Sequence, residues 1–174
     1  SPFTDSQSLG QEVKMAKTKI HGFTVQERLG KMDVDLITLT PDTATEECVA
    51  GDVIFQADEI ENCVSVQGGT CILQSIGVLD DDDNGQAIDI VFMDTTGLLD
   101  AGDDGGTIDA ADGVIPDAIL GVVSITNYFD GIAWQYGHKE NIGLVLRAAS
   151  GTKSIYVAAV NRGSTDTWTA AGLR

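Results

Sequence analysis

Short apolar stretches with a two-residue period recur along the chain, and clusters of Gly, Asp, Asn and Ser separate them. Alternation of this kind is typical of β-strands, and many short strands at close spacing are typical of a sandwich or barrel. The pattern predicts strands at Glu12–Thr18, Val34–Leu39, Val53–Phe55, Ile60–Val66, Thr70–Leu79, Ala87–Met93, Leu120–Ile125, Ile142–Ala148 and Ile155–Val160.

The stretch Ile155–Val160 is apolar on both of its faces. One face would present Ile155, Val157 and Ala159, and the other Tyr156, Ala158 and Val160. A strand that is apolar on both faces is typical of the centre of a sheet that is covered on both sides. We therefore expect this strand to be central.

Three turn clusters predict hairpins between consecutive strands: Gln67–Thr70, Asp80–Gly85 and Ser150–Lys153. Each contains Gly or Asn-Gly, which adopt positive φ at low cost, as tight turns require. Sequential hairpins favour an antiparallel meander or Greek key over a parallel sheet. Helical patterns are weak, with one short turn expected near Ile115–Ile119.

The remaining segments set the domain organisation. Residues 94–113 contain five Gly and six Asp and predict a long loop. Residues 1–11 predict an extended arm, and residues 12–174 a single antiparallel β-sandwich domain.

Apolar runs such as Ile119–Ile125 are too short to span a bilayer, and the polar stretch Ser1–Lys19 lacks the apolar segment of a secretory signal.

Charge narrows the choice of partners. The chain has 27 Asp and Glu against 10 Lys and Arg, a net charge of −17. Such a field repels phosphate backbones and anionic lipids, so we expect neither nucleic acid nor membrane as a partner.

The three cysteines, Cys48, Cys63 and Cys71, are an odd number without a CxxC pair, and we expect free thiols and synthesis in a reducing cytoplasm.

Catalytic motifs are not evident in the sequence. It has no G-x-S-x-G, H-E-x-x-H, P-loop or dinucleotide fingerprint, and its two histidines, His21 and His138, have no second ligand at metal-binding spacing. We therefore expect a protein that is not an enzyme, with no catalytic residues and no cofactor.

One acidic run leaves a metal site open. Counted from Asp80, oxygen ligands fall at positions 1, 3 and 5 (Asp80, Asp82 and Asn84) and Gly85 at position 6, as in an EF-hand loop. Position 12 is Val91 instead of Glu, and strands replace the flanking helices. A solvated hairpin tip is the first interpretation, and a Ca²⁺ site outside the EF-hand class is the second.

Aromatic residues also allow two interpretations. They could form a platform on which sugars stack, or belong to a core or interface. The residues concerned are Tyr128, Phe129, Trp134, Tyr136 and Trp168.

Several further runs lie within residues 33–174: Val49–Phe55, Glu59–Val64, Gly68–Thr70, Leu73–Ile76, the acidic turn Leu79–Gly85 with Ile88–Phe92, Ile119–Ile125, Asn141–Leu146 and Ile155–Gly163. Together these runs resemble a family of structural proteins of tailed phages, the head decoration or cement proteins.

The resemblance implies a jelly-roll β-sandwich with an N-terminal arm. It also implies a homotrimer that binds the major capsid protein on the outer surface of the virion, after synthesis in the cytoplasm of the bacterial host. Residues of the arm and a nearby basic cluster are the candidates for capsid contact: Ser1, Pro2, Phe3, Lys14, Lys17 and Lys19. The alternative is a receptor- or glycan-binding module of a tail, fibre or baseplate.

Overall fold

A computed structural model describes residues 18–20, 23–25, 35–96 and 118–174. The chain divides into two units, Ser1–Leu36 and Ile37–Arg174. In the first, β1 (Thr18–Ile20) and β2 (Phe23–Val25) pair antiparallel, with Ile20 opposite Phe23. The predicted arm, its boundary with the sandwich, most of the strand predicted from residue 12 and most of the loop predicted over residues 94–113 lie outside the described residues.

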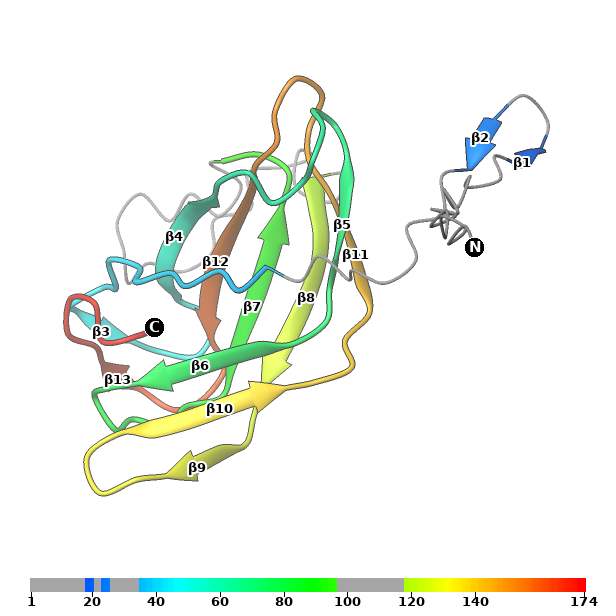
Figure 1. Ribbon diagram of the computed structural model, residues 1–174. Coiled ribbons are helices and arrows are strands. Elements are labelled where there is room, and N and C mark those ends of the chain that lie inside the picture. The colour runs from blue at the N-terminus through cyan, green and yellow to red at the C-terminus, as the bar shows by residue number, and fades with distance from the viewer. Residues whose placement is uncertain (1–17, 21–22, 26–34, 97–117) are drawn as a thin grey trace, which may run out of the picture. The chain divides into compact units, whose positions relative to one another are not determined.

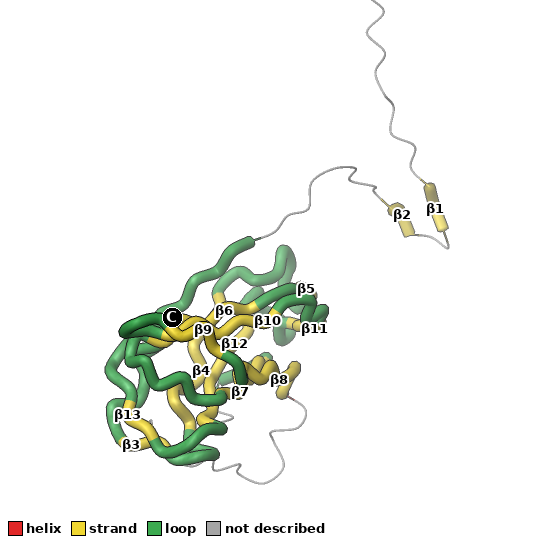
Figure 2. The backbone as a smooth tube through the Cα atoms, turned by 90° about the horizontal axis from the view of Figure 1, so that it is seen from below, coloured by secondary structure: helices red, strands yellow, loops and turns green. Residues whose placement is uncertain are grey.

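The described part of the second unit consists almost entirely of strands and loops, which confirms the predicted all-β fold (Figure 2). Among the described residues, no helix is long and apolar enough to cross a lipid bilayer. The strands are β3 (Glu47–Cys48), β4 (Val53–Ile60), β5 (Thr70–Leu73), β6 (Ile76–Asp80), β7 (Ile88–Met93), β8 (Ile119–Ile125), β9 (Tyr128–Asp130), β10 (Gln135–Lys139), β11 (Leu144–Arg147), β12 (Ile155–Asn161) and β13 (Asp166–Thr167).

These strands form two main layers (Figure 1). One layer is a four-stranded antiparallel sheet in the order β4-β12-β7-β8. The other contains the sheet β6-β10-β9 and the pair β5-β11, and β3 pairs with β13 at one end. The main core lies between the layers, because it collects inward side chains such as Phe55, Phe92 and Ile155 from the first and Val78 and Leu146 from the second.

The antiparallel pairs are nested around residues 94–118. From the inside outwards, β7 pairs with β8, β6 with β10, β5 with β11, β4 with β12 and β3 with β13. A hydrogen bond from the Ile142 N–H to the Gln74 carbonyl (3.0 Å) links the β6–β10 and β5–β11 pairs into one bent ribbon. The fold is therefore one long antiparallel ribbon, which is rolled up so that β12 also pairs with β7.

Strand β12 is central and covered on both faces, as predicted. It lies between β4 and β7, and Ile155, Val157 and Ala159 belong to the main core. On its other face, Ala158 and Val160 are buried in a second apolar cluster. That cluster also contains Val53, Val91, Met93 and Ala118.

All three predicted hairpins are wrong. The turns exist, and Gly68, Gly85 and Gly151 have the expected positive φ of 65°, 60° and 88°. However, the strands that flank each turn pair with other strands: β6 with β10, β7 with β12 and β8, and β11 with β5. Each of these turns therefore carries the chain from one layer to the other.

Strand boundaries also differ from the prediction. Residues 35–39 and 61–66 are irregular, while β4 continues to Ile60. The stretch Thr70–Leu79 is interrupted at Gln74 and Ser75, where the ribbon bends. The prediction missed β9 and β10, because Tyr-Gly-His within β10 does not alternate between apolar and polar residues.

Candidate functional site

Asp80, the first residue of the acidic turn, is buried. Its side chain is 0% exposed, and its two carboxylate oxygens accept hydrogen bonds from the backbone N–H groups of Asp82 (3.0 Å) and Gly85 (2.7 Å). Burial raises the pKa of Asp80, although the hydrogen bonds from Gly85 and Asp82 act in the opposite direction. The prediction of a solvated hairpin tip is wrong for Asp80, since its carboxylate holds the turn together from the inside.

Asp82 and Asn84 connect the same turn to the C-terminal segment. The Asp82 carboxylate accepts hydrogen bonds from the backbone N–H (2.8 Å) and the hydroxyl (2.6 Å) of Thr169. The Asn84 side-chain amide donates to the carbonyl of Thr167 (3.1 Å). Both side chains thus fasten the turn to residues that follow it by more than 80 positions.

The last three residues run along β6. Leu173 forms an antiparallel bridge with Asp80, and Leu79 and Arg174 exchange two backbone hydrogen bonds of 2.7 and 2.9 Å. The Leu173 side chain is buried in the main core, and Arg174 forms an ion pair with Asp81. The acidic turn and the C-terminal segment therefore form one structural unit.

These contacts determine how the turn could bind a cation. Asp80, Asp82 and Asn84 each make hydrogen bonds with other protein groups, which a bound cation would have to replace or share. Among the residues that the structure describes, no three His, Cys, Asp or Glu side chains are grouped as metal ligands. A Ca²⁺ site here would require these hydrogen bonds to rearrange, and it stays a prediction.

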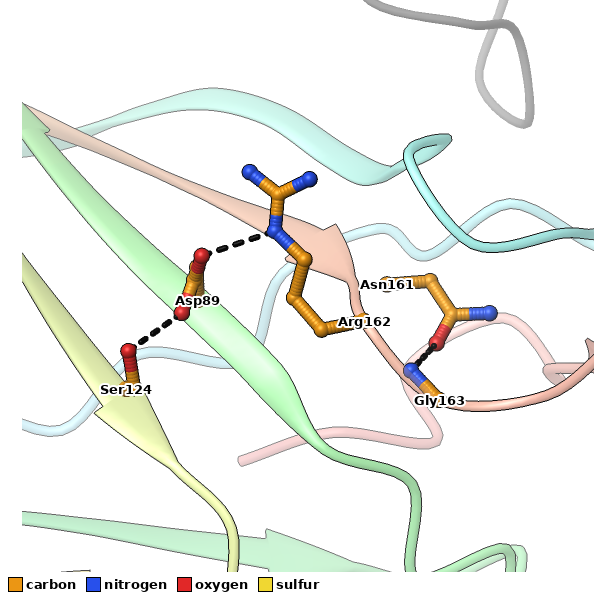
Figure 3. Close-up of polar contacts among 5 residues, drawn as sticks. All are labelled: Asp89, Ser124, Asn161, Arg162 and Gly163. Carbon is orange, nitrogen blue, oxygen red and sulfur yellow. Dashed lines mark hydrogen bonds and ion pairs between the residues drawn. The ribbon is translucent and has the colours of Figure 1, made fainter.

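A second polar cluster lies where β12 ends (Figure 3). Asn161 is buried, and its amide donates to the carbonyls of Cys48 (3.0 Å) and Ser164 (2.9 Å) while its oxygen accepts from the Gly163 N–H (2.9 Å). The next residue, Arg162, pairs with Asp89 on β7 at 2.7 Å.

Asp89 also accepts a hydrogen bond of 2.5 Å from the hydroxyl of Ser124 on β8. Burial would raise the pKa of Asp89, but Ser124 and Arg162 together hold it below its usual value. This group connects β7 and β8 with the residue that follows β12. Both oxygens of the Asp89 carboxylate have a partner, as is typical of a structural network.

The structure brings together three of the five aromatic residues considered for a stacking platform. Phe129 on β9, Trp134 in the β9–β10 turn and Tyr136 on β10 are exposed, and the rings of Phe129 and Trp134 lie 5.9 Å apart. Trp168 and Tyr128 are separated from them, because both pack into the main core.

His138 extends the exposed aromatic group, with its ring stacked on Tyr136 at 5.8 Å. Sequence reasoning missed this grouping because it did not predict β9 and β10. The pattern Tyr136-Gly137-His138 was the available signal, since a two-residue period places both rings on one face of a strand.

The candidates for capsid contact lie mostly outside the described residues: Ser1, Pro2, Phe3, Lys14 and Lys17. Lys19 lies in β1, opposite Thr24. His21 also lies outside the described residues.

The three cysteines form no disulfide with one another. Cys48 is buried, whereas the Cys63 and Cys71 thiols are half-buried and contact each other. Burial, with a smaller effect of Cys71, raises the pKa of Cys63 to about 11. A hairpin with a two-residue loop at Gly68-Gly69 would place Cys63 opposite Gln74, away from Cys71. That predicted register is wrong, because residues 61–66 do not form a strand.

Comparisons of the chain with known protein families, curated proteins and solved structures found no match.

Proposed function

We propose that this protein decorates and stabilises the outside of a phage head. It binds the major capsid protein as a homotrimer, with a jelly-roll sandwich as its body and residues 1–11 as its anchoring arm. The bound copies bridge neighbouring capsid proteins, so their many weak contacts add to the stability of the shell.

The nested ribbon is the observation that supports this proposal most strongly. A jelly roll consists of two sheets formed by a rolled antiparallel ribbon. Here successive pairs of the ribbon alternate between the layers. The pair β7–β8 lies in the first layer, the pairs β6–β10 and β5–β11 lie in the second, and the pair β4–β12 lies in the first again. This alternation supports the jelly-roll part of the proposal.

The polar groups that the structure describes support a structural role. Asp80, Asp82 and Asn161 use their side chains to hold turns and chain segments together. A particle-bound protein gains from such contacts, because they stabilise the body without requiring a ligand. The net charge of −17 suits an outward surface that repels other particles.

Binding to undecorated heads tests the proposal. Intact protein should co-sediment with heads at physiological salt, and the quantity bound should correspond to a repeated position of the capsid lattice. Deleting residues 1–11 should weaken binding while leaving the sandwich folded, because the core residues that the structure describes begin at Leu39.

Two variants separate the arm from the basic cluster. Replacing Lys14, Lys17 and Lys19 by Ala should weaken binding most at low salt, where charge attraction is least screened. Lys153→Ala, at an exposed turn of the sandwich, is the matched control and should bind like intact protein.

Two results would change the proposal in different ways. Intact protein that does not bind heads but binds tails or host cells would favour the receptor-binding alternative over the decoration role. Arm-deleted protein that binds heads as well as intact protein would leave the decoration role standing and remove the arm as its anchor.

A further inference from the structure

The outward face of the β6-β10-β9 sheet is apolar and aromatic. In these strands Val78, Asp80 and Gly137 are buried, so alternation turns Gly77, Leu79, Phe129, Tyr136 and His138 outward. Ile132 and Trp134 in the β9–β10 turn adjoin them. We call this surface the aromatic face: Leu79, Phe129, Ile132, Trp134, Tyr136 and His138.

Several of these side chains are well exposed. Phe129 is 68% exposed, Trp134 40% and Tyr136 41%, and Ile132 is fully exposed. Since a large apolar side chain offers about 150–250 Å², the four together present on the order of 500 Å². That approaches the largest apolar patch of an ordinary monomer and supplies more than half of the ~800 Å² that each partner contributes to a standard interface.

The rings are held in place by their neighbours. Trp134 packs over Gly131 and Tyr136 over Gly77, where any side chain would collide with the ring. The Gly131 N–H donates to the Trp134 carbonyl (2.8 Å), which fixes the turn, and Phe129 and His138 pack on the two rings. A surface ordered in advance loses little conformational entropy on binding.

The face carries no negative charge of its own. None of its six residues is acidic, in a chain with 27 Asp and Glu. A basic partner would be drawn to the acidic surfaces, whereas two copies that each carry −17 repel each other least when they meet through faces without carboxylates. Interface centres are likewise poor in charge and rich in Tyr, Trp and Phe.

We propose that the aromatic face is the contact between copies of this chain. The inference specifies the self-association that the proposed function includes. Within the described residues β9 pairs only with β10, so its outer edge adds a place where a second copy can approach.

The test is the mass of the full chain by sedimentation velocity, from about 1 μM to about 500 μM, near physiological salt. Intact protein should form a discrete oligomer, and Ile132→Glu should weaken association at least tenfold, because it buries an unpaired charge in the contact. Phe129→Ser should weaken association in the same direction. Both residues are exposed, so at a concentration where intact protein is also monomeric the melting temperatures should stay close to that of intact protein.

Ile72→Glu is the matched control. Ile72 is an exposed isoleucine on β5, outside the aromatic face, and the substitution adds the same charge. It should leave the oligomer unchanged. Trp134 gives a second readout, since its fluorescence should shift to shorter wavelength on assembly, whereas Trp168 is already buried in the core.

An Ile132→Glu variant that assembles like intact protein would overturn the inference. Intact protein that stays monomeric at every concentration would also overturn it. If soluble oligosaccharides of the host envelope then alter Trp134 fluorescence, the aromatic face binds a glycan instead of a second copy. Head binding is measured separately, so the two proposals can fail independently. A monomer that binds heads refutes only the contact between copies, and an oligomer that does not bind heads refutes only the decoration role.

Discussion

Asn161 shows how single polar residues fix this fold. Its side chain is buried among strand ends and makes three hydrogen bonds, to Cys48, Ser164 and Gly163. Asp80 does the same for its turn. The sequence placed both residues next to apolar strands. Asp80 and the turn that it closes are local, but the contact of Asn161 with Cys48 joins residues 113 positions apart, and no local pattern indicates it.

Asn161→Leu should destabilise the protein by about 2–4 kcal/mol. The substitution has nearly the same size, but it leaves the buried Cys48 carbonyl and the partly buried Ser164 carbonyl and Gly163 N–H without their partner, and the loss at a buried group costs about 1–3 kcal/mol. Urea unfolding of the variant measures the change in free energy. Asn127→Leu, at an exposed position, is the control and should alter stability by less than about 0.5 kcal/mol.

The Cys63 thiol should react slowly with alkylating agents in the native protein. Only the thiolate reacts, and with a pKa of about 11 the thiolate is about a hundredfold less populated at pH 8 than for an ordinary cysteine. The alkylation rate, followed by mass spectrometry of the Cys63 peptide, should rise about tenfold per pH unit and level off only near pH 11.

The unfolded chain in urea is the control, in which Cys63 should react at the ordinary rate. A native-state rate that levels off near pH 8.5 would contradict the raised pKa. A Cys63–Cys71 disulfide in freshly purified protein would contradict the expectation of free thiols.

At the scale of elements, apolar alternation located most of the long strands, but pairing did not follow from it. Strand β12 was predicted to be central because both of its faces are apolar, and this is confirmed. The turns at Gly68, Gly85 and Gly151 were recognised by their glycines, yet positive φ occurs both in hairpins and in connections between layers. Whether a turn forms a hairpin or connects the two layers depends on which strands pair when the ribbon rolls up.

The C-terminal segment illustrates the same limit. Gly172-Leu173-Arg174 has no strand pattern of its own, yet it bridges β6 and buries Leu173. Its position depends on the acidic turn, through contacts that no local pattern reveals.

Leu173→Ala should therefore cost about 2–4 kcal/mol, as for a leucine in the middle of a core. Chemical denaturation provides the measurement. Ile72→Ala, which removes an exposed side chain of similar size, should be nearly neutral. A Leu173→Ala protein as stable as intact protein would mean that the segment detaches easily from β6.

At the scale of the whole molecule, charge and apolar surface are distributed unequally. Acidic residues fill turns and loops, while the aromatic face has none. The sequence indicated the first feature directly, from the clusters of Asp. The second required the structure, because Phe129, Tyr136 and His138 share a face only once β9 and β10 are known to pair.

The net charge of −17 should make stability depend on salt. Mutual repulsion of carboxylates destabilises the compact state, and the screening length falls from about 30 Å at 0.01 M salt to about 8 Å at 0.15 M. The melting temperature should therefore rise by a few degrees as NaCl increases from about 10 to 200 mM. Thermal unfolding followed by circular dichroism measures the shift.

Calcium provides the decisive comparison, because the same measurement tests the acidic turn. At matched ionic strength, about 1 mM CaCl₂ should raise the melting temperature no more than MgCl₂ does, since Asp80 and Asp82 already accept hydrogen bonds from protein groups. A ligand that binds only the native state must stabilise it. A further rise of several degrees with Ca²⁺ alone, abolished by Asp80→Ala combined with Asp82→Ala, would establish a calcium site in this turn.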